Sequence, residues 1–245
     1  MSTAWTAAAT PPELLPGQVH IWRARLQGRR DRLALWGYLD DDERRQAQAY
    51  YRPIHGERFA SARGLLRLLA AAYTGQSPRA VRFATGPHGK PELLASPMPL
   101  EFNLSHSEDL ALIAFARQGR LGVDVEQVRT LPDALPLARR NFATDEVRWL
   151  NSTSPQQQAE VFFRIWTRKE AVLKAVGAGL SLDLQGFSVV PVVGAGETVP
   201  LALIPDITPD PWRWYELEPA ADFLGCLVYD ADVASLTTLE AADFG

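Results

Sequence analysis

Carboxylates at two places in the chain have the types and spacing of a metal-binding site. Asp124 and Glu126 stand two residues apart in Gly122–Glu126, a short segment that predicts a strand. On a strand, such residues project from the same face, so two like charges would stand together among valines. A hard divalent cation relieves both the repulsion and the cost of burial, and oxygen ligands suit Mg²⁺. The alternative is a solvated strand edge that carries two exposed acids.

A third carboxylate, Glu170, lies on the best-defined predicted helix, which includes Phe162–Lys174 and ends at Gly177. The apolar residues of this helix fall on one arc, and Trp166, Glu170 and Lys174 follow the edge of that arc at spacings of four residues. Glu170 should therefore border the core, where it could complete an oxygen ligand set. The alternative is an exposed Glu–Lys pair worth only ~0.3 kcal/mol.

Candidate anion-binding residues precede the carboxylates. His106 follows a predicted strand, Lys90 lies in a Gly-Lys-Pro loop, and arginines at 52, 58, 63 and 67 add positive charge. Each of these residues alone could equally be a surface side chain, and His106 could be a hydrogen-bonded core histidine. The sequence contains neither a Walker loop nor a GxGxxG fingerprint, which excludes an ordinary nucleotide-binding enzyme.

The remaining pattern predicts strands and helices in both parts of the chain. Strands are expected at 19–22, 81–84, 102–104, 110–116, 122–126, 212–215 and 223–229. One helix should open at the acidic run that follows Leu39, and a longer one should run from Glu57 to Tyr73 after a break at Pro53. The residues between 105 and 109 are expected to form a loop, and Pro132 and Pro136 are interpreted as loop positions.

A weak internal repeat relates the two parts. A shift of 104 positions (123 − 19) aligns Val19 with Val123 and Phe59 with Phe163. The same shift places leucine at the position of Glu170, so the charged groups belong to one copy only. We therefore expect two similar α+β halves with a site at the interface between them.

Bulk properties limit the class of protein. The chain has 245 residues, a net charge of −4 and one cysteine, Cys226, which argues against nucleic-acid binding, an internal disulfide and a multi-cysteine metal site. A run long enough for a membrane span is absent from the sequence, and we expect a cytoplasmic protein. The expected organisation is a flexible tail at 1–17, halves at 18–118 and 119–230, and a second tail at 231–245.

Three blocks in order resemble the signature of the 4′-phosphopantetheinyl transferases. They are Phe102–Ser107, Gly122–Glu126 and Trp166–Lys174, and Gly89-Lys90-Pro91 resembles the block that precedes them. The resemblance runs from about residue 52 to residue 190, and its two-half length is that of the Sfp-type branch. It implies a pseudo-two-fold α+β monomer with the 4′-phosphopantetheinyl transferase fold.

The resemblance also implies roles for individual residues. Asp124, Glu126 and Glu170 would bind Mg²⁺, with Mn²⁺ as the alternative metal. Asp124, Glu170 and Lys174 would be catalytic, with Glu170 as the base for a serine hydroxyl and Lys174 on the pyrophosphate. The residues expected to contact coenzyme A are Arg52, Arg67, His88, Gly89, Lys90, Pro91, Ser105, His106 and Lys174.

The implied reaction transfers the phosphopantetheine arm of coenzyme A to a serine of an apo carrier protein and releases adenosine 3′,5′-bisphosphate. Carrier docking is expected at Arg139, Arg140 and Phe142, near three leucines. Asn141 stands where the family usually has an aromatic residue, which leaves carrier selection open. The second hypothesis is a non-catalytic module of the same fold that binds coenzyme A or a carrier.

Overall fold

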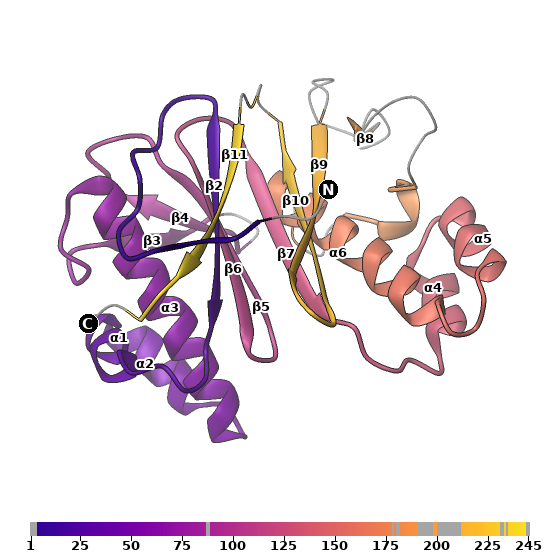
Figure 1. Cartoon of the computed structure of the whole chain (residues 1–245), viewed down its shortest axis with the longest axis horizontal. Coiled ribbons are helices and arrows are strands. Elements are labelled where there is room, and N and C mark those ends of the chain that lie inside the picture. Colours follow the sequence, from indigo (N-terminus) through magenta and orange to yellow (C-terminus); the bar gives the residue numbers. More distant parts are fainter. Residues whose placement is uncertain are drawn as a thin grey trace. The chain divides into compact units, whose positions relative to one another are not determined.

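The computed structural model describes residues 4–86, 89–177, 179, 182–190, 198–199, 212–230, 233 and 235–243 (Figure 1). These residues form two compact units. The first unit contains Ala4–Thr85, Pro91–Gln118 and the described residues after Asp232. The second unit contains the described residues of Gly86–Lys90 and Gly119–Ala231.

A mixed five-stranded sheet forms the centre of the first unit. Its strand order is β1-β11-β2-β6-β5, and a separate hairpin pairs β3 with β4. The strands are β1 Thr6–Ala8, β2 Gln18–Arg25, β3 Arg82–Thr85, β4 Pro91–Leu94, β5 Glu101–Ser107, β6 Leu110–Ala116 and β11 Ser235–Ala241. β11 pairs in parallel with both β1 and β2, whereas β6 pairs antiparallel with β2 and β5. Every residue of β6 is buried, which explains its continuous apolar sequence.

Three helices belong to the first unit, α1 Arg32–Tyr38, α2 Asp41–Gln48 and α3 Pro53–Thr74. Pro53 begins α3, a position where the missing N–H of proline costs nothing. Gly75 ends the helix at φ 69°, in the left-handed region that favours glycine. Apolar side chains of α3 pack with residues of β2, β5 and β6 in one buried cluster.

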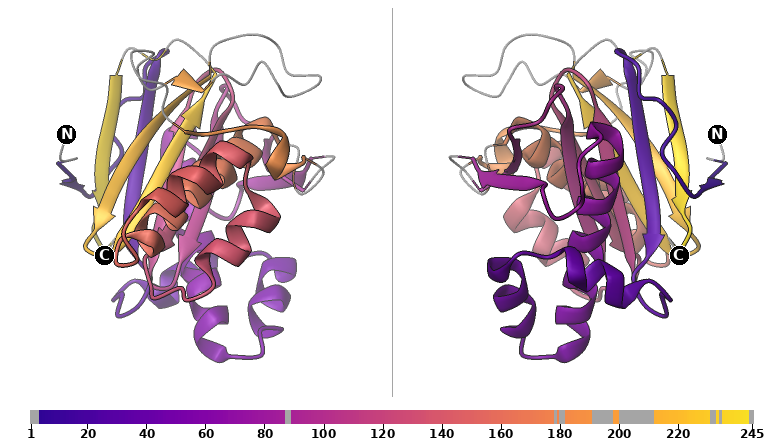
Figure 2. Two further views of the ribbon diagram at one scale, coloured as in Figure 1. Left: turned by 90° about the vertical axis from the view of Figure 1, so that its right-hand side faces the viewer. Right: turned by 90° about the vertical axis from the view of Figure 1, so that its left-hand side faces the viewer.

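An antiparallel four-stranded sheet, ordered β7-β10-β9-β8, forms the centre of the second unit. Its strands are β7 Leu121–Gln127, β8 Thr198–Val199, β9 Trp212–Ala220 and β10 Phe223–Tyr229. Its helices are α4 Ala134–Asn141, α5 Thr144–Ser152 and α6 Gln158–Val176, with a short 3₁₀ turn at Leu184–Gly186. α6 packs across β7 and β10, as the left view of Figure 2 shows.

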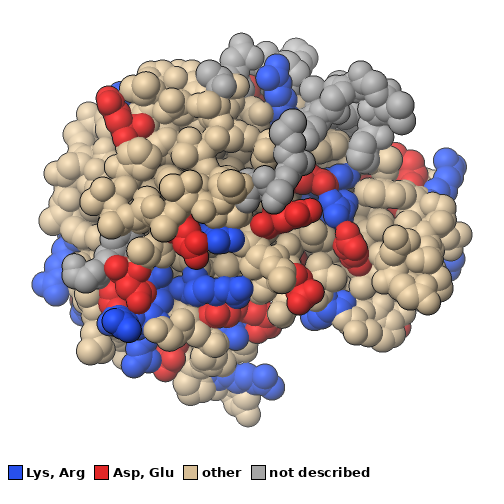
Figure 3. All heavy atoms as spheres, viewed as in Figure 1, with Lys and Arg blue, Asp and Glu red and all other residues tan. Residues whose placement is uncertain are grey.

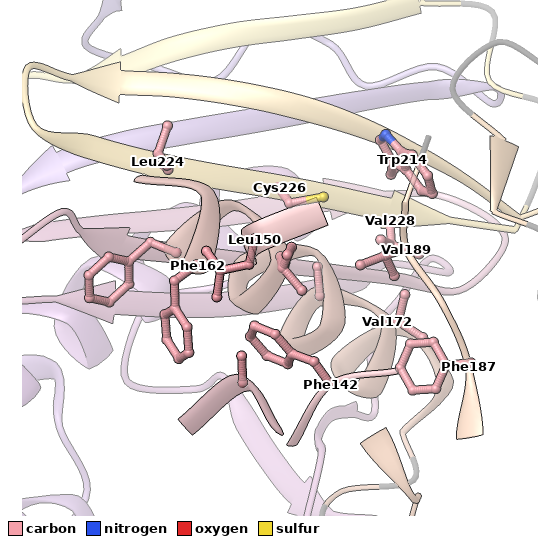
Figure 4. Close-up of a cluster of buried hydrophobic side chains, with 14 of the residues drawn as sticks. Phe142, Leu150, Phe162, Val172, Phe187, Val189, Trp214, Leu224, Cys226 and Val228 are labelled. Carbon is pink, nitrogen blue, oxygen red and sulfur yellow. The ribbon is translucent and has the colours of Figure 1, made fainter. Parts of the chain in front are cut away.

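The core of the second unit lies between α6 and the sheet. Its buried apolar side chains include Phe142, Phe162, Val172, Trp214 and Cys226 (Figure 4). The rings of Phe142 and Phe162 lie 5.0 Å apart between centroids, within the range of interacting aromatic pairs. Burial of this cluster fixes α6 on the sheet whose strand β7 carries two of the candidate metal ligands.

The expected repeat appears in the order and position of the elements inside each unit. β2, α2 and α3 of the first unit begin at 18, 41 and 53, and β7, α5 and α6 of the second begin at 121, 144 and 158. In each unit a glutamate of the short helix, Glu43 or Glu146, accepts the backbone N–H of the residue three before it. The same glutamate pairs with a cationic side chain of the long helix, Arg67 or Lys169.

The structure corrects several expectations about the elements. The segments treated as tails contain strands, since Thr6–Ala8 and Ser235–Ala241 pair within the first sheet. The expected loop after Leu104 is wrong, because β5 continues through Ser107 and only Glu108 and Asp109 form the turn. Pro136 lies in the first turn of α4, where proline is tolerated.

Acidic and basic side chains are interspersed over the face of the molecule shown in Figure 3. Such mixing agrees with the modest net charge of −4 and gives the field of this face no single sign. Among the helices that the structure describes, none is both long and apolar enough to cross a membrane.

Candidate active site

The predicted carboxylates of the second unit are brought together by the packing of α6 on β7. Asp124 lies opposite Cys226 and Glu126 lies opposite Leu224 in the pairing with β10, so both acids occupy the face that carries the core beneath α6. A Cβ atom at Gly122 would stand 2.2 Å from the carbonyl oxygen of Ala171. Because glycine removes that atom, the α6 backbone can approach β7 directly.

The close approach of α6 to β7 brings the side chain of Lys174 into contact with that of Asp124. Its Nζ donates to Oδ1 of Asp124 at 2.6 Å and to the carbonyl oxygen of Val123 at 3.3 Å. The side chain of Asp124 is 6% exposed and that of Lys174 is 27% exposed, so the ion pair lies at the border of the core. Lys174 thereby balances part of the negative charge that this strand carries.

Glu170 lies one turn before Lys174 on α6, within range of the charges of Asp124 and Glu126. Burial raises the pKa of the Glu170 carboxyl, and the charge of Asp124 raises it further. Lys174 acts in the opposite direction, and Glu126 again raises the pKa. Glu126 is itself a quarter exposed, and its Oε2 lies 3.8 Å from Arg129. The three predicted acids therefore interact through their charges.

These residues fit a divalent cation in the chemistry of their donors. Three carboxylates form the hard oxygen set that Mg²⁺ takes, and a cation beside Glu170 would offset the neighbouring negative charges that raise the pKa of its carboxyl. Their arrangement does not itself form a cage, since no group of three or more His, Cys, Asp or Glu residues in the described part of the chain is placed to hold an ion. The metal-ligand assignment of Asp124, Glu126 and Glu170 stays a prediction.

The loop at Gly86–Lys90 belongs to the same unit as the carboxylates. Gly89 adopts φ 89°, which favours glycine, and its N–H donates to the carbonyl oxygen of Gly86 at 3.0 Å. Nζ of Lys90 donates to the carbonyl oxygen of Leu121 at 3.0 Å, which anchors the loop to β7. His88, the remaining predicted contact in this loop, lies outside the described residues.

Two other predicted coenzyme A contacts, Pro91 and His106, line a pocket of about 260 Å³ in the first unit. His106 is exposed and lines this pocket together with Pro91 and Arg63. Ser105 is buried, as expected for a neighbour that points to the opposite face of β5, and it does not line the pocket. Sequence reasoning missed the rest of the lining, which is Tyr50, Phe59, Ala62, Phe102, Asn103 and Leu104.

The arginines of α3 have different environments. The side chain of Arg67 is 1% exposed, and its guanidinium donates to Glu43 at 2.6 Å, Asp40 at 2.6 Å and the Val81 carbonyl at 2.7 Å. The expectation that Arg67 contacts coenzyme A is therefore contradicted, because its surface is covered by protein. Arg63 binds the other oxygen of Glu43 but retains 15% exposure at the pocket. Arg52 is exposed at the start of α3.

The residues of the predicted docking segment also differ in their exposure. Arg139 and Arg140 are exposed on α4, but Phe142 is 3% exposed and packs in the core. Phe142 can therefore offer a partner little surface, contrary to the expectation. A groove of about 510 Å³ lies between α4 and α5 and is lined by Arg139, Phe142, Ala143, Thr144, Val147, Arg148, Asn151 and Gln185. Arg148 and Asn151 were not predicted, because a polar face on a short helix carries no distinctive sequence signal.

Comparisons with known proteins identify the family to which the chain belongs. A sequence model of the 4′-phosphopantetheinyl transferase superfamily matches residues 120–224, the segment that holds β7 and α6. The 4′-phosphopantetheinyl transferase HetI of Nostoc sp. (strain PCC 7120) is 37% identical over 207 residues, which cover 82% of this chain and 87% of HetI. The 4′-phosphopantetheinyl transferase Sfp of Bacillus subtilis (strain 168) is 30% identical over 152 residues, which cover 62% of this chain and 66% of Sfp. Similarity of this extent shows that the chain belongs to the 4′-phosphopantetheinyl transferase superfamily, in its Sfp-type branch.

Proposed function

We propose that the protein transfers the 4′-phosphopantetheine arm of coenzyme A to a serine of an apo carrier protein and releases adenosine 3′,5′-bisphosphate. The observation that carries the proposal is the group formed by Asp124, Glu126, Glu170 and Lys174 on β7 and α6. Family membership supplies the reaction class, and this group supplies the charges that the reaction needs. The proposal includes a cytoplasmic monomer, as the sequence analysis expects.

Each residue has a distinct task in this proposal. Lys174 presents a positive charge to the diphosphate of coenzyme A, where negative charge develops as the bond to the leaving group breaks. Glu170 accepts the proton of the attacking serine hydroxyl. Asp124, Glu126 and Glu170 would hold Mg²⁺ or Mn²⁺, which when bound neutralises phosphate charge. Asp124 also positions the lysine through their 2.6 Å contact.

The pocket beside His106 would receive part of coenzyme A in the first unit. A histidine, an arginine and aromatic side chains can bind a phosphate and stack on a purine ring. We assign the phosphate contact to Arg63 and His106 in place of Arg67, because Arg67 is covered by protein. Arg52, exposed at the start of α3, remains a further candidate.

Mass spectrometry of carrier proteins tests the transfer directly. Incubation with coenzyme A, Mg²⁺ and several apo carriers should add one phosphopantetheine arm to the carriers that the enzyme serves. Asp124→Ala should abolish this transfer while the fold is retained, and Asp133→Ala, which removes an exposed acid before α4, should leave it unchanged. Full transfer by Asp124→Ala with Mg²⁺ as the only metal would refute the assignment. Binding of coenzyme A without transfer to any carrier would favour the non-catalytic module.

We place carrier docking at the exposed arginines of α4 beside the groove of the second unit. Carrier proteins of this reaction class are acidic, so reversal of Arg139 and Arg140 to glutamate should slow association and weaken its dependence on salt. Reversal of Arg30 and Arg82, which are exposed in the first unit, changes the net charge equally and serves as the control. An unchanged kcat/KM for carrier at low salt in the Arg139→Glu, Arg140→Glu variant would place docking elsewhere.

A further inference from the structure

Glu216 of β9 lies in the same row of the second sheet as Asp124 of β7. Cys226 of β10 is the register partner of both acids, so the row crosses three strands with Cys226 in the middle. Neighbouring strands lie ~4.8 Å apart, which places the backbones of the two acids ~10 Å from each other, about the diameter of a helix. Cys226 is fully buried in the core beneath α6 (Figure 4). The row therefore has one acid near each side of this helix.

Helix α6 binds the two acids from opposite flanks. On one flank Lys174 contacts Asp124, as described above. On the other, Nε of Arg168 donates to Oε1 of Glu216 at 2.9 Å. The two cations are six residues apart, which at about 100° per residue puts them ~120° apart around the helix axis. Ala171 lies midway between them and is fully buried, and its carbonyl faces β7. The helix thus lies on the sheet between two ion pairs.

The pair on the Glu216 side is held rigidly. Arg168 is 4% exposed, and its guanidinium carbon lies 5.4 Å and 5.0 Å from the ring centroids of Trp149 and Trp214. Nη1 of Arg168 donates to the carbonyl oxygen of Val189 at 2.8 Å, and Nη2 donates to the same Glu216 oxygen as Nε does. Since contacts on both its faces and at three nitrogens fix Arg168, its bond to Glu216 holds this flank of α6 in place.

The rotation of α6 about its own axis decides where Glu170 stands. Glu170 lies on the helix between the two cations in sequence, and the charges of Asp124 and Glu126 act on it from β7. A helix with its side chains has a radius of ~5–6 Å, so a rotation of ~10° moves the end of a side chain by ~1 Å. A misplacement of this size can reduce a rate ~100-fold. One ion pair alone would act as a pivot, whereas two on opposite flanks resist the rotation.

We propose that Glu216 and Arg168 are positioning residues for the transfer reaction, because they set the rotation of α6 and thereby the places of Glu170 and Lys174 against β7. The inference rests on the proposed function, in which Glu170 is the base and Lys174 meets the diphosphate. Neither positioning residue needs to contact a substrate, since their effect passes through the helix.

Arg164 supplies a matched pair of substitutions. It donates to the second oxygen of Glu216 on the sheet, and also to Glu160 of its own helix at 3.0 Å. Glu216→Gln weakens the bonds between helix and sheet, whereas Glu160→Gln weakens only a bond within the helix and is the control. Glu216→Gln should reduce kcat at least ~3-fold and change the KM for carrier by less than ~2-fold. Glu160→Gln should leave both constants unchanged.

Stronger variants test whether the two positioning residues act as a unit. Glu216→Leu removes both acceptors and should reduce kcat at least ~10-fold in a protein that circular dichroism shows to be folded. Adding Arg168→Met to this variant should reduce kcat little further, because the contact is already lost. If Glu216→Leu does not fold, the comparison of Glu216→Gln with Glu160→Gln still decides.

Amide chemical shifts report the position of the helix without substrates. In NMR spectra of the full-length protein, the backbone amide signals of residues 170–174 should move in Glu216→Gln and stay in place in Glu160→Gln. A residue that only stabilises the fold would lower the free energy of unfolding, but it would move neither these signals nor kcat.

Two results would overturn the proposal. One is a folded Glu216→Gln protein with the kcat of Glu160→Gln, and the other is a set of 170–174 amide signals that coincides with those of the wild type. Absence of transfer by the wild type would refute the proposed function instead, and the amide signals would then decide whether Glu216 fixes the helix. A selective loss of kcat together with moved signals supports the proposal.

Discussion

Replacement of Lys169 by methionine should destabilise the second unit strongly. Lys169 is fully buried, and its Nζ donates to the carbonyl oxygens of Leu184 and Phe187, both at 2.7 Å. It also lies 2.9 Å from Oε2 of Glu146, which is equally buried. The Glu146 carboxylate accepts backbone N–H groups at 2.7 and 2.8 Å as well. The pair therefore joins α5, α6 and the segment after α6.

The expected loss in the free energy of unfolding follows from the buried groups that lose a partner in Lys169→Met. The volume of methionine is similar, so the cavity term is small, but two buried carbonyls lose a donor and one buried carboxylate loses its counter-charge. Breaking a buried ion pair from one side costs ~3–5 kcal/mol. Combination of Glu146→Gln with Lys169→Met removes both charges, so the double variant should be more stable than the sum of the single changes predicts, by ~1–3 kcal/mol.

Chemical denaturation followed by circular dichroism and tryptophan fluorescence measures these differences. The two probes should be compared, because two units can unfold in separate transitions. Arg148→Met on the exposed face of α5 is the control and should change the free energy of unfolding by less than ~0.5 kcal/mol. A loss below ~1 kcal/mol for Lys169→Met, or strict additivity in the double variant, would refute the reasoning.

The same variant has a defined response to pH. Burial raises the pKa of Glu146, and Lys169 lowers it, so removal of the lysine should raise this pKa further. When a carboxyl has a higher pKa in the folded state than in the unfolded state, its protonation stabilises the folded protein. The difference between Lys169→Met and the wild type should therefore narrow as pH falls from about 8 to about 5. A difference that widens over this range would contradict the assignment of burial as the dominant cause.

Two further predictions concern the packing of each unit. Gly122→Ala should lower the free energy of unfolding by at least ~2 kcal/mol and reduce transfer, because its Cβ would meet the Ala171 carbonyl oxygen at 2.2 Å. Gly37→Ala, whose Cβ meets only a flexible arginine at 3.7 Å, is the control in denaturation and transfer assays. Acid should also destabilise the first unit through His20, because burial lowers the pKa of this histidine from 6.5 to about 4. The stability that is present above pH 6.5 should be lost as the pH falls towards 4, by up to ~3 kcal/mol. Tyr73 lies 2.7 Å from Nδ1 of His20, and unfolding of His20→Gln as a function of pH should show a smaller slope; an equal slope would refute the role of His20.

Local patterns predicted the elements that carry the candidate site. β7 and α6 follow the expected residues closely, because an apolar alternation and a helix ended by glycine are both local signals. The contact of Lys174 with Asp124 needed the close approach at Gly122, which no local pattern indicates. The two elements were thus predictable from local patterns, whereas the contact between them depended on packing.

Long-range partners explain the errors. The resemblance to the family implied that Arg67 contacts coenzyme A, but its acidic partner Glu43 is 24 positions away and only the packing of α2 on α3 joins them. Phe142 was expected at the surface, although aromatic partners on α6 bury it. Helix α1 was not predicted because its seven residues include neither a side-chain cap nor an acidic first turn.

The position of β11 near the end of the sequence has a consequence for the order in which the two sheets are completed during synthesis. Arg23 of β2 pairs with Glu240 of β11 at 2.7 Å, across a sequence separation of 217 residues. The whole of Gly119–Ala231 leaves the ribosome before this partner exists, so the second unit can fold while β2 still presents an unpaired edge. Synthesis therefore completes the sheet of the first unit last, and a nascent chain stalled before Ser235 should bind chaperones through that edge.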